Sequence, residues 1–170
     1  MKRTKLSQWV FLVGVAVGVA QIVMMGSLLP SRVASHFGAS GVADGFMSRE
    51  AFLAMQWTLT GFVAALFFSI AALLRVLPHD AINRPNKDYW LAPERRTATL
   101  DYVSDRMYAF GAATFALLTG VGQQVYEANI RGTLTLGTVT GVYLLCYLLY
   151  TAIWCAALFK RFSLPATPRL

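Results

Sequence analysis

Four long runs of apolar residues, separated by polar connections, dominate the hydropathy pattern of this 170-residue chain. A membrane-spanning helix needs about 20 largely apolar residues, and each run approaches or exceeds that length. The predicted spans cover residues 8–29, 51–77, 107–126 and 134–159. The pattern therefore predicts an all-α integral membrane protein, a four-transmembrane-helix bundle that forms a single membrane domain over residues 1–170.

Two of the connections are long enough to have a structure of their own. Residues 30–50 join the first two spans; Pro30 is expected to end the first helix, and Gly38, Gly41 and Gly45 favour turns. Residues 78–106 join the second and third spans, and Pro93 begins a stretch with helical spacing that is expected to run into the third span. The last connection is short, which predicts an antiparallel pair for the last two helices.

Composition and charge support a membrane location and set an orientation. Hydrophobic residues make up 56% of the chain and charged residues 14%, whereas soluble domains contain about 25% charged residues. A net charge of +7 could indicate nucleic-acid binding. However, 12 of the 15 Lys and Arg residues lie near the two termini or between the second and third spans, which is the distribution of a membrane protein. The positive-inside rule then predicts cytoplasmic termini and a cytoplasmic 78–106 loop in the bacterial inner (plasma) membrane, with loop 30–50 outside and no nucleic-acid partner. The first run exceeds the usual signal-peptide core of about 7–15 residues, which favours a span over a cleaved leader.

The outer loop carries the most promising chemistry. Candidate ligand- or partner-binding residues there are His36, Phe37, Gly41, Asp44 and Arg49. Asp44 could accept a hydrogen bond from the His36 ring or pair with Arg32 or Arg49, for recognition or sensing. The alternative is that His36 and Asp44 bond to the backbone and only fix the shape of the loop.

The same loop gives no reason to expect catalysis. A zinc site needs three or four ligands, and this side of the membrane offers one histidine with few acids, so no metal is expected. The chain contains no recognisable nucleophile motif or phosphate-binding glycine loop. We therefore expect a non-enzymatic protein without a cofactor.

The predicted spans contain uncharged polar residues and glycine pairs in place of buried charges. Gln21, Gln56, Gln123 and Gln124 are expected to form hydrogen bonds between helices. An alternative function is a small-molecule transporter or permease subunit that uses Gln21, Gln56 and a glycine-lined gap between the first and fourth spans. The glycine pairs Gly14/Gly18 and Gly137/Gly141 predict close helix packing, within the chain or in a homodimer.

A second polar motif lies in the predicted cytoplasmic connection. Its candidate contact residues are Asn86, Lys87, Tyr89, Trp90, Arg95 and Arg96. The two aromatic residues suit the headgroup level of a bilayer, and the turn formers before them predict an ordered turn at the interface.

Both motifs resemble those of a known bacterial family. The spacing Leu29-Pro30, Val33, His36-Phe37-Gly38, Gly41, Asp44-Gly45, Ser48-Arg49 resembles the signature of the membrane family called domain of unknown function 1648. Pro85-Asn86-Lys87-Asp88-Tyr89-Trp90, followed by Pro93-Glu94-Arg95-Arg96, is similar to a second motif that members tend to carry after the next span.

The resemblance implies a protein that recognises a partner and does not catalyse a reaction. The best understood relatives are immunity proteins against a sporulation-delaying toxin, which also relay the presence of the toxin to a cytoplasmic repressor. The expected partners are accordingly the lipid bilayer and a membrane or extracytoplasmic protein, with an immunity-like or signalling-accessory role centred on the outer loop.

Overall fold

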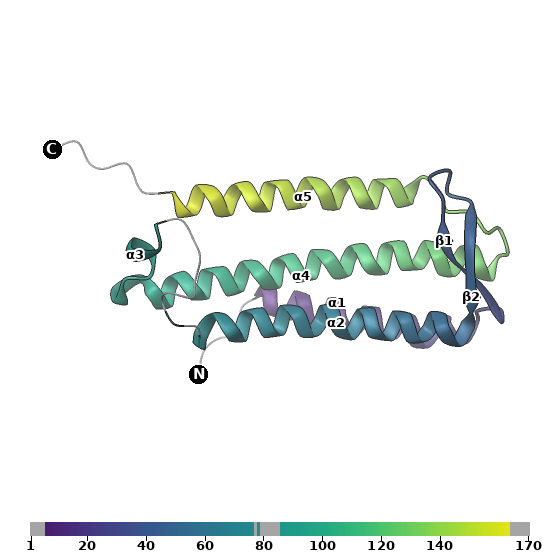
Figure 1. The fold of residues 1–170 in the computed structure, drawn as a ribbon, viewed down its shortest axis with the longest axis horizontal. Helices are drawn as coiled ribbons and strands as arrows, with labels where there is room; N and C mark the ends of the chain where they lie inside the picture. The colour runs from purple at the N-terminus through teal and green to yellow at the C-terminus, as the bar shows by residue number, and fades with distance from the viewer. Residues whose placement is uncertain (1–5, 77, 79–85, 164–170) are drawn as a thin grey trace.

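The computed structural model describes residues 6–76, 78 and 86–163, and it is mostly helical (Figure 1). Its elements, in chain order, are α1 (Leu6–Gly26), β1 (Arg32–Phe37), β2 (Ala43–Ser48), α2 (Arg49–Val76), α3 (Lys87–Trp90), α4 (Pro93–Ile130) and α5 (Val139–Phe162). The four long helices run side by side, with α4 between α5 and the pair formed by α1 and α2 (Figure 1).

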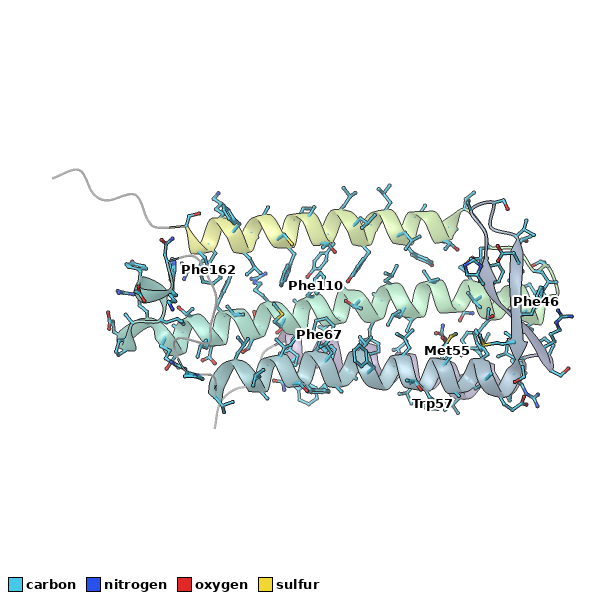
Figure 2. All side chains as sticks on the ribbon, viewed as in Figure 1. Phe46, Met55, Trp57, Phe67, Phe110 and Phe162 are labelled. Carbon is cyan, nitrogen blue, oxygen red and sulfur yellow. The ribbon has the colours of Figure 1, made fainter. Side chains whose placement is uncertain are left out.

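Three of the described helices, α1, α2 and α5, are long and apolar enough to span a membrane. Most of their side chains point away from the bundle, and Figure 2 shows Trp57 on α2 directed outward, as expected of lipid-facing surfaces. The fourth long helix, α4, is less apolar because its first turns are polar and because Gln123 and Gln124 lie near its other end. It nevertheless extends along the whole bundle, about 57 Å at 1.5 Å per residue.

The predicted helix boundaries are close to those observed, with two instructive differences. The first helix ends at Gly26, before Pro30, and the last begins at Val139 and not at residue 134. Residues 134–136 are instead held by backbone hydrogen bonds to the outer loop. The predicted helix from Pro93 is confirmed, and it runs without a break into the third predicted span. The end of the predicted second span, at residue 77, and residues 79–85 lie outside the described residues.

The all-α expectation was wrong for the outer loop. Residues 32–37 and 43–48 form an antiparallel β-hairpin, which lies across one end of the bundle (Figure 1). Exposed and half-buried residues alternate on β2, so one face of this strand is exposed while the other packs toward the helices. An ordered loop with turns at its glycines was expected from the sequence, and strands were not predicted there.

Glycines let α1 approach α4 closely. A Cβ atom at Gly14 would lie 3.0 Å from Cβ of Phe115, and one at Gly111 would lie 2.8 Å from the ring of Phe11. Phe11 is fully buried and meets Phe67 and Phe115 edge-on, with ring centroids 5.9 and 5.7 Å apart. This aromatic cluster forms the core of the half of the bundle opposite the hairpin, and Figure 2 shows Phe67 between α2 and α4.

Helix α5 packs against α4 through aromatic side chains. Phe110 on α4 lies 4.7 Å from Trp154 and 5.8 Å from Tyr147, measured between ring centroids, and Figure 2 places Phe110 between the two helices. Gly141 faces open space, while a Cβ atom at Gly137 would lie 3.7 Å from Gln124 Oε1 of α4, so the two glycines do not form a common seam against one helix. The Gly14/Gly18 pair packs on Phe115 of the same chain. A homodimer through either pair stays a prediction.

The two polar motifs lie at opposite ends of the bundle. The hairpin and the connection between α4 and α5 share one end, while α3, the start of α1 and the end of α5 share the other (Figure 1). Four long helices that alternate in direction produce this arrangement, and it separates the two candidate surfaces by the length of the bundle.

Candidate functional site

The hairpin brings His36 and Asp44 together because its register is irregular. Ala34 pairs with Phe46, but His36 pairs with Gly45 and Phe37 with Ala43, so the ladder shifts twice within four residues. A Cβ atom at Gly45 would lie 2.8 Å from Cβ of His36. Glycine is therefore required opposite the histidine, and the shift turns the side chain of Asp44 toward the imidazole ring.

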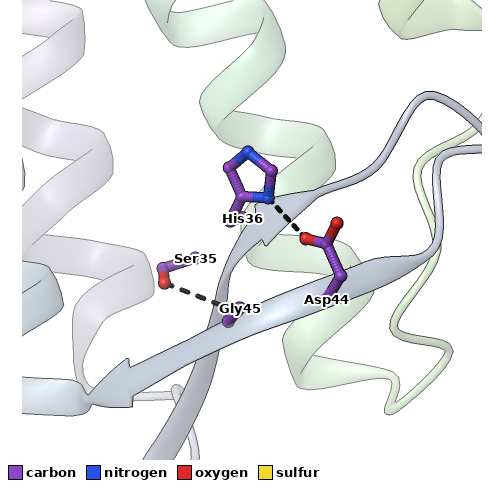
Figure 3. Close-up of polar contacts among 4 residues, drawn as sticks. All are labelled: Ser35, His36, Asp44 and Gly45. Carbon is purple, nitrogen blue, oxygen red and sulfur yellow. Dashed lines mark hydrogen bonds and ion pairs between the residues drawn. The ribbon is translucent and has the colours of Figure 1, made fainter.

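His36 and Asp44 form a hydrogen-bonded pair between Nδ1 and Oδ1, as Figure 3 shows. Of the partners considered for Asp44, the structure shows the His36 ring. Both side chains remain largely exposed, at 74% for His36 and 54% for Asp44. With Nδ1 held by the carboxylate, Nε2 is left to meet a ligand, since it has no partner within the described part of the chain.

Ser35 is the hydroxyl residue next to His36 in the sequence. Its hydroxyl donates to the carbonyl of Gly45, at 3.5 Å (Figure 3). Among the described residues no hydroxyl or thiol side chain is hydrogen-bonded to His36. The arrangement can accept, donate and exchange hydrogen bonds with a partner at the surface.

Asn129 attaches the hairpin to α4. Its Oδ1 accepts from the Ala34 N–H at 2.7 Å, and its Nδ2 donates to the Ala34 carbonyl at 3.0 Å and to the Val125 carbonyl at 2.9 Å. Both backbone groups of Ala34 thus point away from β2, and the amide side chain substitutes for a neighbouring strand. Asn129 and Ala34 are both buried.

Below this attachment the hairpin rests on an apolar cluster. Val33 and Tyr126 are fully buried, and they pack with Leu29 and Phe52. The Phe52 and Tyr126 rings meet edge-on at 5.8 Å between centroids. One face of the hairpin is therefore part of the core of the bundle, and it holds the exposed face in a fixed position.

The connection between α4 and α5 secures the tip of the hairpin. The Ala43 N–H donates to the Leu134 carbonyl at 3.0 Å, and the Leu136 N–H donates to the Gly41 carbonyl at 2.9 Å. Gly41 has φ = 79°, a left-handed conformation that favours glycine, and a Cβ there would lie 2.9 Å from the Leu136 carbonyl oxygen. The role of Gly41 visible in the structure is thus to pair with this connection.

The other outer-loop candidates are divided between the exposed face and the base of the hairpin. The Arg32 guanidinium lies over the exposed ring of Phe46, 4.7 Å from its centroid. Arg49 donates to the Leu29 carbonyl at 3.4 Å and meets Glu50 at 3.5 Å, so it does not pair with Asp44. Phe37, at the end of β1, is half-buried.

Comparison with known families assigns the hairpin and its flanking helices to one unit. Residues 10–60 match the model of the family described as "Domain of unknown function (DUF1648)". The chain carries a DUF1648 domain. No curated protein and no solved structure matches the chain.

The DUF1648 match covers most of α1, the whole hairpin and the first part of α2. It stops before α4, so Asn129 and residues 134–136, which hold the hairpin in place, come from outside the matched range. Sequence reasoning missed both attachments. One signal was present, because Asn129 shares a helical face with Gly122 and Tyr126.

The second motif lies beyond the DUF1648 match, and much of it serves to hold α5. Asn86 Nδ2 and Trp90 Nε1 both donate to the Phe162 carbonyl, each at 3.1 Å. Trp90 is buried and meets the Phe162 ring edge-on at 5.5 Å between centroids. These bonds satisfy a carbonyl in the last turn of α5, which has no partner within the helix. Trp90 is thus a packing residue and not a freely exposed contact residue.

The remaining members of this motif lie at the surface around α3. Arg95 donates to the Tyr89 carbonyl at 2.8 Å, and its guanidinium lies 4.1 Å from the centroid of the Tyr89 ring. Lys87 and Arg96 are half-buried. Arg161 of α5 covers the Trp90 ring at 4.6 Å. The structure gathers these cations at the end of the bundle opposite the hairpin.

The two glutamines expected in a transport pathway lie on one cavity, but not where a gap was expected. Gln21 of α1 and Gln56 of α2 line a space between α1, α2 and α4. The fourth predicted span, α5, packs on the other side of α4. Transport stays a prediction.

Proposed function

We propose that the chain is a four-span, non-enzymatic protein of the bacterial plasma membrane that recognises an extracytoplasmic protein partner through its DUF1648 hairpin. In this topology α4 is the third span, since it lies alongside α1, α2 and α5, and its polar side chains meet other helices. Both chain ends are cytoplasmic, as the positive-inside rule requires of the end that carries Lys87, Arg95, Arg96 and Arg161.

One observation carries the recognition proposal: a firmly attached hairpin presents an exposed face. Side-chain and backbone hydrogen bonds from α4 and residues 134–136 hold the backbone, and buried Val33 holds one face. The opposite face presents the His36–Asp44 pair and the Arg32–Phe46 stack. A rigid surface with cationic, aromatic and hydrogen-bonding groups loses little conformational entropy on binding, which is the property of an efficient protein-binding site.

Substitution of the pair tests this proposal without disturbing the attachment. We would express a tagged His36→Ala, Asp44→Ala double variant, extract it in lipid nanodiscs from its native membrane, and identify copurifying proteins by mass spectrometry. Because both side chains are exposed, insertion and abundance should match wild type, while a specific partner should be lost. The matched control is Glu127→Ala, Arg131→Ala, which removes an ion pair of 3.2 Å at the same end but off the hairpin. Retention of every partner by the double variant would contradict a recognition role for this pair.

A further inference from the structure

A cavity of about 160 Å³, partly open at the surface beside the exposed Met55 and Leu59, lies between α1, α2 and α4 in the half nearest the hairpin. Two glycines explain the space, since Gly18 and Gly122 place no side chain on the wall where α1 meets α4. The Phe115 ring, part of the aromatic cluster, bounds one side, and Ser35 of β1 lies at the hairpin side. The walls are otherwise mainly apolar side chains of α2 and α4.

Besides Ser35, the polar residues that line this mainly apolar space are Gln21, Gln56, Thr60 and Thr119. Gln21 is the one whose amide is fixed by two hydrogen bonds to α4. Its Nε2 donates to the Thr119 carbonyl at 2.9 Å and to Gln123 Oε1 at 3.1 Å, which fixes the orientation of the amide. A Cβ atom at Gly122 would lie 2.9 Å from Gln21 Oε1, so this oxygen occupies the space that the glycine leaves. Within the described part of the chain, Oε1 accepts no hydrogen bond.

Gln21 Oε1 stays accessible from the cavity, and a bound molecule whose donor reached this oxygen would gain a hydrogen bond among mainly apolar walls. The two bonds made by Nε2 prevent the amide from turning Oε1 toward another part of the protein. A lipid acyl chain would not form this bond, since it carries no hydrogen-bond donor. The cavity therefore suits a molecule with an apolar body and a donor group.

We infer that this cavity is a binding site for a small, mainly apolar molecule with one hydroxyl or N–H donor, which bonds to Gln21 Oε1. Its size sets the class of ligand, because a cavity of about 150 Å³ in another protein accommodates benzene. A single aromatic ring or an alkyl group of similar volume fits, with its donor directed at α1. The site is independent of the exposed hairpin face, so it is a second function of the same bundle.

Fluorine NMR of nanodisc-embedded protein tests the site with two probes of similar size. 4-Fluorobenzyl alcohol carries the donor and 4-fluorotoluene does not, while both partition into lipid. Wild type should show a saturable bound component for the alcohol, above that of empty nanodiscs and displaced by unlabelled benzyl alcohol. The alcohol should bind more tightly than the toluene, by about tenfold if one net hydrogen bond is gained.

Two variants and two matched controls assign the signal to the cavity. Gly18→Leu should abolish binding, because a Cβ there makes only ordinary contacts of 3.5 Å with Phe115 and the rest of the side chain fills the space. Gln21→Met should remove the preference for the alcohol. The controls are Gly61→Leu, at a glycine facing open space, and Gln124→Met, an amide facing Gly137 away from the cavity. Both controls should bind like wild type.

Three results would overturn the inference. They are the absence of a saturable component in wild type, binding by a folded Gly18→Leu variant at wild-type affinity, and an unchanged alcohol preference in Gln21→Met. Circular dichroism establishes folding of each variant. If Gly18→Leu does not fold, the Gln21→Met comparison alone decides, because it depends on the ratio of the two probes and not on total binding.

Discussion

Replacement of Asn129 by leucine should release the hairpin from α4 while leaving the helices intact. Leucine branches at Cγ as asparagine does, but it can neither accept from the Ala34 N–H nor donate to its carbonyl. Because Ala34 is fully buried, both of its backbone groups would lose their partner without gaining water. The change thus separates the attachment of the hairpin from the packing of the bundle.

The expected size of the effect follows from these two groups. Each buried backbone group left without a partner costs about 1–3 kcal/mol, so the attached state should lose at least about 2 kcal/mol. A loss of that size changes an equilibrium by about 30-fold. The hairpin should open locally that much more often, whereas the aromatic core around Phe11 should keep its stability.

Amide hydrogen exchange in nanodiscs measures this opening directly. Exchange at residues 32–37 should accelerate by about 30-fold in Asn129→Leu, with α1 and α2 unchanged. Gln124→Leu is the matched control, since it removes an amide from the same helix without touching the hairpin. Wild-type exchange across β1 in Asn129→Leu would refute the reasoning, because it would mean that the apolar cluster alone holds the hairpin.

Three further substitutions test the packing of the site and of the bundle. Gly45→Ala places a methyl group 2.8 Å from Cβ of His36 and should lower the thermal midpoint of unfolding, measured by differential scanning fluorimetry. The control, Gly61→Ala, lies in open space and should be neutral or stabilise α2 by up to about 1 kcal/mol. Gly111→Ala puts a methyl group 2.8 Å from the nearest aromatic ring and should cost about 1–3 kcal/mol in reversible unfolding; a wild-type value would show that the rings move aside. Trp90→Phe removes the N–H that donates to the Phe162 carbonyl and should destabilise the last turn of α5 by about 1 kcal/mol, which faster amide exchange in that turn would show. The control, Tyr89→Phe, should leave this exchange rate unchanged.

The helices could be predicted from sequence because each depends on a local pattern. A long apolar run forms a helix whatever it later packs against, and Pro93 starts α4 as its position in the chain suggests. The contact between His36 and Asp44 was also within reach, since only eight residues separate them. The irregular strand register that creates the contact was not, because it depends on how Gly45 fits opposite the histidine.

The attachments of the site could not be predicted because they join distant parts of the chain. Asn129 lies 95 residues from Ala34, and nothing in the local sequence marks an asparagine near a helix end as the partner of a strand. Trp90 shows the same limit: its type suits the headgroup region, yet its ring is buried against Phe162, 72 residues away. Polar residues that complete distant backbone groups are recognisable only once the fold is known.

The two attachments of α5 imply an order of events during biosynthesis. Its C-terminal end is held by Asn86 and Trp90, and the connection before it pairs with the hairpin at Gly41 and Ala43. All of these partners leave the ribosome before α5 does. Until the connection and the last helix are in place, the tip of the hairpin and the α3 segment both retain unpaired hydrogen-bonding groups. A chain that ended before residues 134–136 would therefore present the hairpin without the partners of its tip, and one that ended before α5 would leave Asn86 and Trp90 without the Phe162 carbonyl.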